Sequence, residues 1–440
     1  MERKKVKIIG GGFAGCEAAV QLSRRGIEVE LYEMKPKVYS PAHSNENLCE
    51  LVCSNSFKAM RLESAAGMMK AEMKMLGSLC VECAEKTAVP AGGALAVDRD
   101  AFSRLVTDRI ESEELITVIR EEVTGIPDGN VIIAAGPLAS APLSESIGKL
   151  CGGALSFFDA AAPIVTAESI DFDRAFMQSR YDRGEPDDYI NCPLNKEEYE
   201  IFYDALINAQ SAETHEFDKR KDVYEGCMPV EVMASRGHDT IRFGPMKPAG
   251  LVDPKTGHRP WANLQLRKEN NEGTMYNLVG FQTNLKFSEQ KRVFSLIPAL
   301  ANAEYVRYGV MHRNTFIDSP RLLTPCFSMR QRSNLFFAGQ ITGVEGYMES
   351  AASGILAGIN MADMLEGRGK FIPPETTICG ALARYVSDES IKNFQPMGAA
   401  FGLLPPLENR IRDKKERYSA LAHRGLEDLE KMLNIQRTAN

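Results

Sequence analysis

The 440-residue chain has few of the features that assign a protein to a class at once. No stretch approaches the roughly 18 to 20 consecutive apolar residues that span a bilayer, which excludes an integral membrane protein. The ten cysteines are too sparse and irregular for a disulfide framework, which favours a reducing, cytoplasmic setting. A formal net charge of -7 excludes non-specific nucleic-acid binding by the whole molecule. A local basic patch on an acidic body still suits a specific nucleic-acid enzyme.

Targeting signals, internal repeats and low-complexity tracts are also absent from the sequence. The apolar run Val6–Ile9 before Cys16 is far too short for the core of a signal peptide. Hydrophobic residues make up 44% and charged residues 25%, as in ordinary globular proteins rather than disordered ones. The length predicts two domains, or one large domain with an insertion.

A glycine turn near the N-terminus is the strongest local signal. The apolar run Val6–Ile9 predicts a buried parallel strand, and a GxGxxG turn follows it, comprising Gly10, Gly11, Gly12, Phe13, Ala14 and Gly15. A helical pattern comes next, then a second predicted strand that ends at Glu33. In such a unit the glycines allow a tight turn and close backbone approach to a pyrophosphate, and the acidic residue accepts from ribose hydroxyls. These residues predict an adenine-dinucleotide site.

Two later strand-to-glycine turns indicate that the dinucleotide is FAD. The first ends at Gly136, and the second, 334–340, runs through Gly339 and Gln340 toward Gly343, Gly346 and Tyr347. Small residues at helical spacing follow over 350–366. A strand that delivers glycines to a helix N-terminus late in the chain is typical of the flavin-contacting end of two-domain FAD proteins. No second GxGxxG is present, so NAD(P)H is expected as a transient reductant.

The middle of the chain differs from its two ends. Aromatic residues and prolines are frequent there, and one helix is predicted over 196–209. The predicted fold class is α/β: a Rossmann-like, glutathione-reductase-like FAD-binding domain interrupted by a smaller α+β insertion domain. The predicted boundaries are 1–157 and 300–440 for the FAD-binding domain, with a helical C-terminal tail, and 158–299 for the insertion.

Two cysteines stand in turn-like contexts that would display a thiol. Cys53 follows apolar residues and precedes Ser54-Asn55-Ser56, and Cys227 lies between a glycine and a proline. An average cysteine is buried filler, but nearby basic groups or a helix end can convert a thiol to a nucleophilic thiolate. Cys80 and Cys83 form a CxxC, which we interpret as two incidental thiols after a long helical pattern over 62–79. No metal site is predicted.

Two further clusters are polar or basic. His312, one of six histidines, stands with Arg313 and Asn314 in strand-like sequence, which makes it a candidate functional residue. The tail holds Arg410, Arg412, Lys414, Lys415 and Arg417 with Tyr418 nearby. A solvated helix face is the simpler interpretation of that tail, and a face that contacts RNA phosphates is the alternative.

Several blocks of the sequence resemble one enzyme family, the folate- and FAD-dependent tRNA (uracil-5-)-methyltransferases called TrmFO. They are the glycine turn with Glu33, Pro41-Ala42-His43, Glu50 to Ser56, Pro90 to Arg99, Tyr224 to Pro229, Arg242 to Pro248, Asn277 to Thr283 and Met311 to Thr315. The resemblance runs from about residue 5 to about residue 430. A related flavoprotein, the tRNA wobble-uridine carboxymethylaminomethyl enzyme, shares the Gly339-Gln340 region but carries a long C-terminal domain that this chain lacks.

The resemblance implies a methylenetetrahydrofolate--tRNA-(uracil-5-)-methyltransferase that oxidises FADH2. Such an enzyme takes carbon from 5,10-methylenetetrahydrofolate and electrons from NAD(P)H through FAD, and methylates C5 of the T-loop uridine of tRNA. Because C5 of uracil is a poor nucleophile, a thiolate that adds at C6 is expected to activate it. Cys53 and Cys227 are expected to share this work, one as nucleophile and one as base or assistant, and His312 is the candidate to cover the folate pterin. No obligate protein partner is expected.

Three alternatives remain open from the sequence. The same chemistry can act on a ribosomal RNA uridine. A flavin-dependent oxidoreductase of a small molecule would need neither paired cysteines nor a basic tail. A non-enzymatic RNA-binding flavoprotein would keep the tail and survive loss of both thiols.

Overall fold

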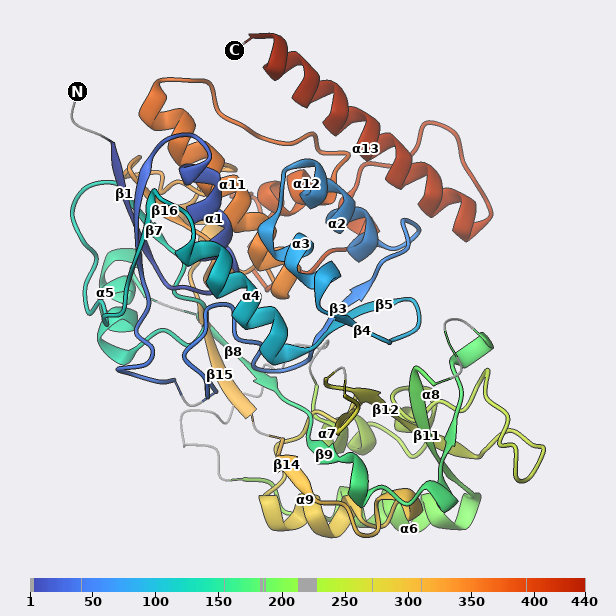
Figure 1. Cartoon of the computed structure of the whole chain (residues 1–440). Coiled ribbons are helices and arrows are strands. Elements are labelled where there is room, and N and C mark those ends of the chain that lie inside the picture. The colour runs from blue at the N-terminus through green and yellow to red at the C-terminus, as the bar shows by residue number, and fades with distance from the viewer. Residues whose placement is uncertain are drawn as a thin grey trace.

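The computed structural model describes residues 4–40, 42–153, 155–182, 185, 187–212, 228–270, 272–309, 311–392 and 394–439. For 155–160, 182, 312–314 and 436–439 it describes the backbone only. Two sheets organise these residues, and they lie in separate lobes (Figure 1). We call them the parallel-sheet lobe and the antiparallel-sheet lobe.

The parallel-sheet lobe is built on five parallel strands in the order β16-β7-β1-β2-β6. Their bounds are β1 Lys5–Ile9, β2 Glu28–Tyr32, β6 Ile116–Ile119, β7 Val131–Ile133 and β16 Leu335–Phe337. β7 and β16 are fully buried apolar runs, whereas β1 and β2 alternate buried apolar residues with charged or partly exposed ones. The predicted α/β class is confirmed.

Helices cover this sheet and extend the lobe. They are α1 Phe13–Ser23, α4 Arg99–Glu111, α5 Ala141–Cys151, α10 Ser319–Leu322 and α11 Tyr347–Glu366. A second layer contains α2 Ala65–Met75, α3 Leu79–Lys86, α12 Ile378–Tyr385, the small sheet β3 Ser56–Ala59, β4 Ala88–Val89 and β5 Ala94–Val97, and the long α13 Lys414–Ala439. Figure 1 shows α13 lying across the outside of α2 and α12.

Close backbone approach fixes α11 against α1. A Cβ atom on Gly354 would lie 2.2 Å from the carbonyl oxygen of Ala14, and one on Gly358 would lie 2.8 Å from that of Ala18. Only glycine at these positions lets the two helices pack at this distance. The result is that the N-termini of α1 and α11 point to the same place, at the carboxyl end of β1.

The antiparallel-sheet lobe has six strands in the order β10-β11-β12-β13-β9-β14. Their bounds are β9 Ile164–Thr166, β10 Phe176–Met177, β11 Tyr189–Leu194, β12 Ala262–Lys268, β13 Met275–Leu278 and β14 Tyr305–Arg307. Its helices are α6 Lys196–Ile207, α7 Val230–Ser235, α8 Thr240–Phe243 and α9 Phe287–Phe294. This lobe packs around its own apolar core, which includes Tyr199, Phe202, Phe281 and Phe294.

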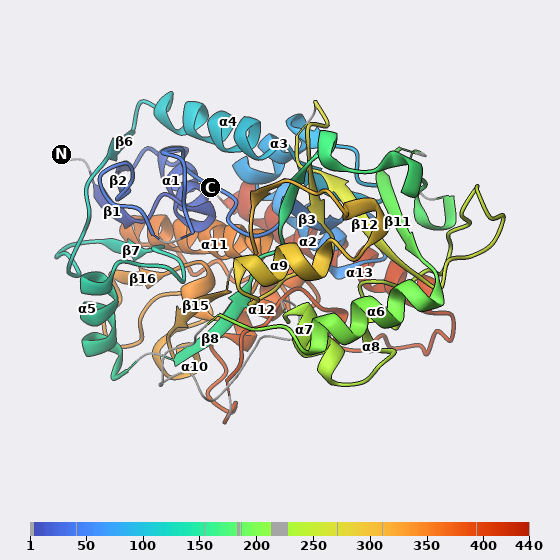
Figure 2. The same cartoon turned by 90° about the horizontal axis from the view of Figure 1, so that it is seen from below.

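Two antiparallel strands, β8 Leu155–Ala160 and β15 Met311–Phe316, connect the lobes. Both views place them between the two sheets (Figure 1, Figure 2). The chain thus leaves the parallel-sheet lobe along one strand and returns beside it along the other. The division at 158–299 stays a prediction.

One local expectation was wrong. The helical pattern over 62–79 is interrupted, because Gly77 has a φ of 74° and ends the first helix, so that α2 and α3 are separate. Cys80 and Cys83 therefore lie in the first turns of α3, after its N-cap Ser78.

Candidate active site

A pocket opens at the carboxyl end of the parallel strands, where dinucleotides bind in such folds. It contains about 1040 Å³ of empty space, open solvent at its mouth included. Its walls come from the turn after β1, the end of β2, the segment after β7 and the N-terminus of α11, and they include Gly10, Gly11, Gly12, Phe13, Ala14, Glu33, Gly339, Gln340 and Tyr347. Most of the predicted cofactor residues therefore line one pocket.

The glycine turn has the geometry that a pyrophosphate requires. Gly10 has a φ of 109°, and a Cβ atom on Gly15 would lie 1.9 Å from the carbonyl oxygen of Gly10, so helix and strand meet only because both are glycine. A Cβ atom on Gly12 would meet nothing within 4 Å. Gly12 is the N-cap of α1 and has no side chain, so the first N–H groups of the helix stay open to the pocket. These residues fit a phosphate-containing cofactor.

Glu33 is held in place from both sides. One carboxylate oxygen accepts from the N–H of Gly11 at 3.0 Å, and the other accepts from the N–H of Lys35 at 3.0 Å. Each oxygen has a second lone pair for a further donor such as a ribose hydroxyl. The turn and Glu33 together fit the adenosine half of FAD.

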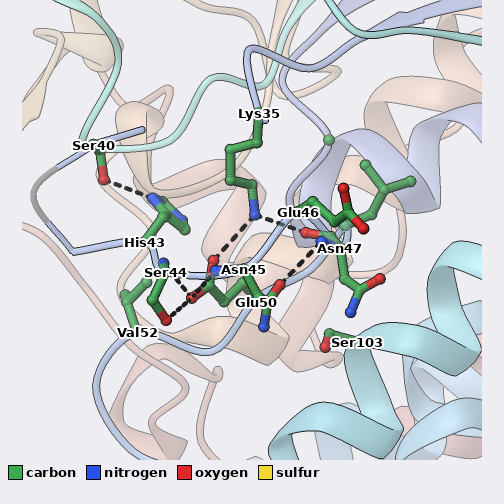
Figure 3. A network of polar contacts seen from close by, with 12 residues as sticks. Lys35, Ser40, His43, Ser44, Asn45, Glu46, Asn47, Glu50, Val52 and Ser103 are labelled. Atoms are coloured by element: carbon green, nitrogen blue, oxygen red, sulfur yellow. Dashed lines mark hydrogen bonds and ion pairs between the residues drawn. The ribbon is translucent and has the colours of Figure 1, made fainter. Parts of the chain in front are cut away.

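A polar network not predicted from the sequence forms the wall beside Glu33 (Figure 3). The ammonium group of Lys35 lies 3.1 Å from a carboxylate oxygen of Glu50, and the other oxygen accepts from the N–H and hydroxyl of Ser44. The Nδ1 atom of His43 lies 2.6 Å from the hydroxyl oxygen of Ser40. Burial lowers the pKa of His43, so this imidazole is neutral at pH 7. The sequence signals were Pro41-Ala42-His43 and Glu50, which belong to two of the blocks that resemble the family.

The second glycine segment brings α11 to the pocket. The N–H of Gly339 donates to the hydroxyl of Ser353 at 2.7 Å, and the amide nitrogen of Gln340 donates to the carboxylate of Glu345 at 2.8 Å. Gly343 and Gly346 have φ values of 81° and 124° and shape the turn, but they are not among the residues that line the pocket.

Cys53 lies next to Tyr347, although 294 positions separate them in the chain. The phenolic oxygen of Tyr347 is 3.1 Å from the sulfur of Cys53. It also accepts from the backbone N–H of Val52 at 3.0 Å and from that of Cys53 at 2.9 Å. These two donors occupy both lone pairs of the oxygen, so the phenolic hydrogen is the one directed at the sulfur. Burial raises the pKa of Tyr347, which keeps it a donor at neutral pH.

Two arginines hold the backbone of this loop. Arg99 donates to the carbonyl oxygens of Leu51 and Cys53, each at 2.6 Å, and Arg307 donates to that of Val52. Their positive charges near Cys53 favour negative charge on its sulfur. Glu269, which is 2% exposed, forms an ion pair with Arg99.

A third arginine ties the same loop to the antiparallel-sheet lobe. Arg267 of β12 donates to the side chains of Asn55 at 3.0 Å and Ser54 at 2.9 Å. Residues 51–55, which we call the Cys53 loop, are thus held by Arg99 from one lobe and by Arg267 and Arg307 from the strands of the other. The sequence placed Arg99 in a recognised block without indicating this role, and no spacing pointed to Arg267 or Arg307.

The remaining predicted residues are not brought into this site by the described part of the structure. Cys227 lies outside the described residues, and His312 is described only by its backbone, which pairs with Asp159. The basic tail forms the start of α13 and the segment before it, where Arg417 is half-buried and the other four basic residues are exposed. There Lys414 and Arg417 lie over the ring of Tyr418, at 5.5 and 5.4 Å from its centre. RNA contact by this tail stays a prediction.

The CxxC pair is buried, as expected for incidental thiols. Burial raises the pKa of Cys80 and raises that of Cys83 to about 11, which keeps both protonated. Among the described residues, no group of histidine, cysteine, aspartate and glutamate side chains has the arrangement of a metal site. Nor does the described part of the chain contain a helix with the length and apolarity to cross a membrane.

Comparison with known proteins gives one consistent family. The family model described as "Glucose inhibited division protein A" matches residues 5–369. The methylenetetrahydrofolate--tRNA-(uracil-5-)-methyltransferase TrmFO of Acetivibrio thermocellus is 58% identical, over 98% of this chain and 98% of its own length. The protein of the same name from Halalkalibacterium halodurans is 53% identical over 98% of this chain and 99% of its own.

The fold agrees with a solved structure of the wider family. Aquifex aeolicus GidA superposes with a TM-score of 0.67 at 17% identity, over 99% of this chain and 76% of its own length. Three observations indicate the same family. They are the parallel-sheet lobe with its glycine turns, the contact of the Cys53 sulfur with the Tyr347 phenol, and the full-length similarity at more than 50% identity. The chain belongs to the TrmFO family, within the group that the glucose-inhibited division protein A model describes.

Proposed function

We propose that the protein methylates C5 of the T-loop uridine of tRNA, with 5,10-methylenetetrahydrofolate as carbon donor and NAD(P)H as the source of electrons. The observation that carries this proposal is the contact of Cys53 with Tyr347, a residue that lines the pocket that fits FAD. The names of relatives more than 50% identical over nearly the whole chain support the substrate. When bound, FAD supplies reducing electrons and the folate supplies the carbon unit.

The residues of the pocket have separable tasks in this proposal. The glycine turn and the N-terminus of α1 hold the pyrophosphate, and Glu33 orients the ribose. The N-terminus of α11 adds its positive end near Gly339 and Tyr347. His312 stays our candidate to cover the folate pterin.

Cys53 and Cys227 activate the uracil. One thiolate adds to C6 of the base, which makes C5 nucleophilic, and the other assists or removes the C5 proton once C5 has formed its new carbon bond. The phenol of Tyr347 and the charges of Arg99 and Arg307 stabilise a thiolate at Cys53. The reacting base must leave its stack to reach the sulfur.

The reaction belongs in the cytoplasm under this proposal. All nine cysteines that the structure describes are free thiols, which supports a reducing setting. The basic tail, namely Arg410, Arg412, Lys414, Lys415 and Arg417, is proposed to contact RNA phosphates.

The test combines purified flavin-loaded protein, 5,10-methylenetetrahydrofolate, NADPH or NADH, and an unmodified tRNA transcript. Nucleoside mass spectrometry is expected to find 5-methyluridine at the T-loop position, and Cys53→Ala and Cys227→Ala are expected to abolish it. Cys151→Ala is the matched control, because Cys151 is the last residue of α5 and lies outside the Cys53 loop.

Two results would contradict the proposal. Methylation of ribosomal RNA but not of tRNA would keep the chemistry and change the target. Consumption of NADPH with neither RNA methylated would replace the methyltransferase by a small-molecule oxidoreductase.

A further inference from the structure

The antiparallel-sheet lobe carries a stack of aromatic and cationic side chains far from the pocket. The guanidinium carbon of Arg242 lies 4.4 Å from the ring centre of Trp261 and 4.7 Å from that of Phe243. The ammonium group of Lys196 lies 5.6 Å from the ring of Trp261. We call these four residues, with the nearby Lys247, the Trp261 surface.

Both rings keep exposed surface although Arg242 lies over them. Phe243 is 67% exposed and Trp261, the only tryptophan of the chain, is 36% exposed. Large aromatic side chains at the surface commonly mark a binding site, because their burial stabilises a complex.

The backbone under this surface is rigid. Arg242 donates to the carboxylate of Asp239 at 2.8 Å, which holds its guanidinium group over the rings of Phe243 and Trp261. The fully buried Met246 donates its N–H to the carbonyl of Ile241 and accepts from the N–H of Asn263 in β12. The side chains of the Trp261 surface are therefore already ordered, so they lose little conformational entropy when a partner binds.

Charge indicates an anionic partner. Residues 236–261 contain five lysines and arginines against two aspartates, in a chain whose formal net charge is -7. Lys247, Lys255 and Arg259 are exposed. Exposed rings combined with cations form the stacking platforms that bind unpaired nucleobases and their phosphates.

The strand β12 sets the distance between this surface and the thiol. Trp261 directly precedes β12, and Arg267 near its other end contacts Ser54 and Asn55 of the Cys53 loop. Six steps along a strand span about 20 Å. A nucleotide on the Trp261 surface is therefore not the one that reacts.

We propose that the Trp261 surface stacks an unpaired base of the RNA substrate, outside the reacting uridine, while Arg242, Lys196 and Lys247 face the adjacent phosphates. This inference rests on the proposed function, because it assigns the RNA a second contact. It gives the antiparallel-sheet lobe a direct part in substrate selection.

The experiment titrates the flavin-loaded protein with unmodified tRNA transcript and follows the emission of Trp261. Stacking of a base is expected to quench that emission. Phe243→Ala should raise the dissociation constant for tRNA roughly 5- to 100-fold, the usual range for loss of one base–aromatic stack. Phe243→Tyr should restore binding. Phe172→Ala, at another exposed phenylalanine, is the matched control and should bind like the parent.

Phosphate contact has its own readout. Lys247→Ala should lower the slope of the logarithm of affinity against the logarithm of salt concentration by about one, as expected for one lost phosphate contact. A blunt duplex RNA without unpaired bases should bind more weakly and leave the emission unchanged.

Several outcomes would overturn the inference. They are equal tRNA affinity of Phe243→Ala and the parent protein, or an unchanged emission at saturating tRNA. Polyglutamate that binds with the same sensitivity to Phe243→Ala would indicate an acidic peptide instead. Failure of the proposed function looks different: quenching and the Phe243 effect would persist, while no 5-methyluridine forms.

Discussion

At the scale of single residues, the phenol of Tyr347 is the centre of the site. Its oxygen accepts two backbone hydrogen bonds from the Cys53 loop and offers its hydrogen to the sulfur. Tyr347 also lines the pocket that fits FAD. The side chain of Tyr347 therefore holds the Cys53 loop, donates to the Cys53 sulfur and lines the pocket that fits FAD.

Tyr347→Phe tests this arrangement. The variant leaves the N–H groups of Val52 and Cys53 without an acceptor and removes the donor to the sulfur. We expect the rate of 5-methyluridine formation to fall at least about tenfold, and the free energy of unfolding to fall by about 1 to 3 kcal/mol. Alkylation of Cys53 by iodoacetamide, followed by peptide mass spectrometry, should also slow.

The matched control is Tyr385→Phe. The hydroxyl of Tyr385 donates to a single carbonyl, that of Gln395, outside the pocket. It should change neither the methylation rate nor the alkylation of Cys53. Equal rates for Tyr347→Phe and the parent protein would show that the phenol does not act on the sulfur.

At the scale of elements, the contact of α11 with α1 shapes the pocket, and a second contact joins α2 to α12 in the outer layer. The N-termini of α1 and α11 meet there because Gly354 allows α11 to touch the backbone of α1 at Ala14. Behind them, Glu72 of α2 accepts from the N–H groups of Ile378 and Cys379, each at 2.8 Å, and so caps α12.

Gly354→Ala should separate α1 from α11. The added methyl group would lie 2.2 Å from a backbone oxygen, so the helices must shift at a cost of about 1 to 3 kcal/mol. We expect a lower free energy of unfolding in urea and weaker retention of FAD on dialysis.

Gly148→Ala in α5, where a methyl group would meet nothing within 4 Å, should instead stabilise the protein by up to about 1 kcal/mol. Tight flavin retention by Gly354→Ala would contradict this account.

Glu72 gives the stability of the protein a dependence on pH. Burial raises the pKa of Glu72 from 4.5 to about 7. Between these values the native state holds a proton that the unfolded state has lost, so the free energy of unfolding falls as pH rises. Glu72→Gln has no such proton, and its stability relative to the parent should therefore rise by at most about 3 kcal/mol between pH 4.5 and pH 8. Urea unfolding at four pH values measures this, and parallel profiles would refute it.

The sequence predicted elements better than contacts. Apolar residues followed by glycine turns predicted β1, β7 and β16, and the strand–turn–helix–strand order of the N-terminal unit predicted β2. The break between α2 and α3 was missed, since one glycine is often tolerated within a helical pattern and here adopts a positive φ. No periodic sequence pattern predicts the contact of Cys53 with Tyr347 or that of Arg267 with Asn55. Each contact joins segments that are far apart in the chain and meet only in the folded protein.

At the scale of the whole molecule, the Cys53 loop lies where the two lobes meet. Arg99 holds it from the parallel-sheet lobe, and Arg267 and Arg307 hold it from β12 and β14 of the other. Glu269 directly follows β12 and forms an ion pair with Arg99 across the junction, which compensates the charge of the arginine. The side chain of Glu269 is 1% exposed and that of Arg99 is 15% exposed, so removing Glu269 leaves a largely buried charge on Arg99.

Glu269→Gln should therefore be costly. We expect a loss of about 3 to 5 kcal/mol in the free energy of unfolding, measured in urea, together with slower methylation. Glu145→Gln removes the exposed ion pair with Lys149 and should leave stability unchanged. Equal stability of Glu269→Gln and the parent would mean that the lobes are held together by other contacts.

Arg99, Arg267 and Arg307 also limit how the two lobes of such a protein can be exchanged during evolution. An inserted unit with its own core is usually regarded as exchangeable, since its removal leaves the host fold intact. Here the antiparallel-sheet lobe supplies part of the scaffold of the Cys53 loop through β12 and β14, so a replacement unit would have to recreate two guanidinium groups and one carboxylate at the same junction. We therefore expect the two lobes to evolve together: residues on both sides of the junction should change in step, and exchange of the antiparallel-sheet lobe alone should disrupt the Cys53 loop.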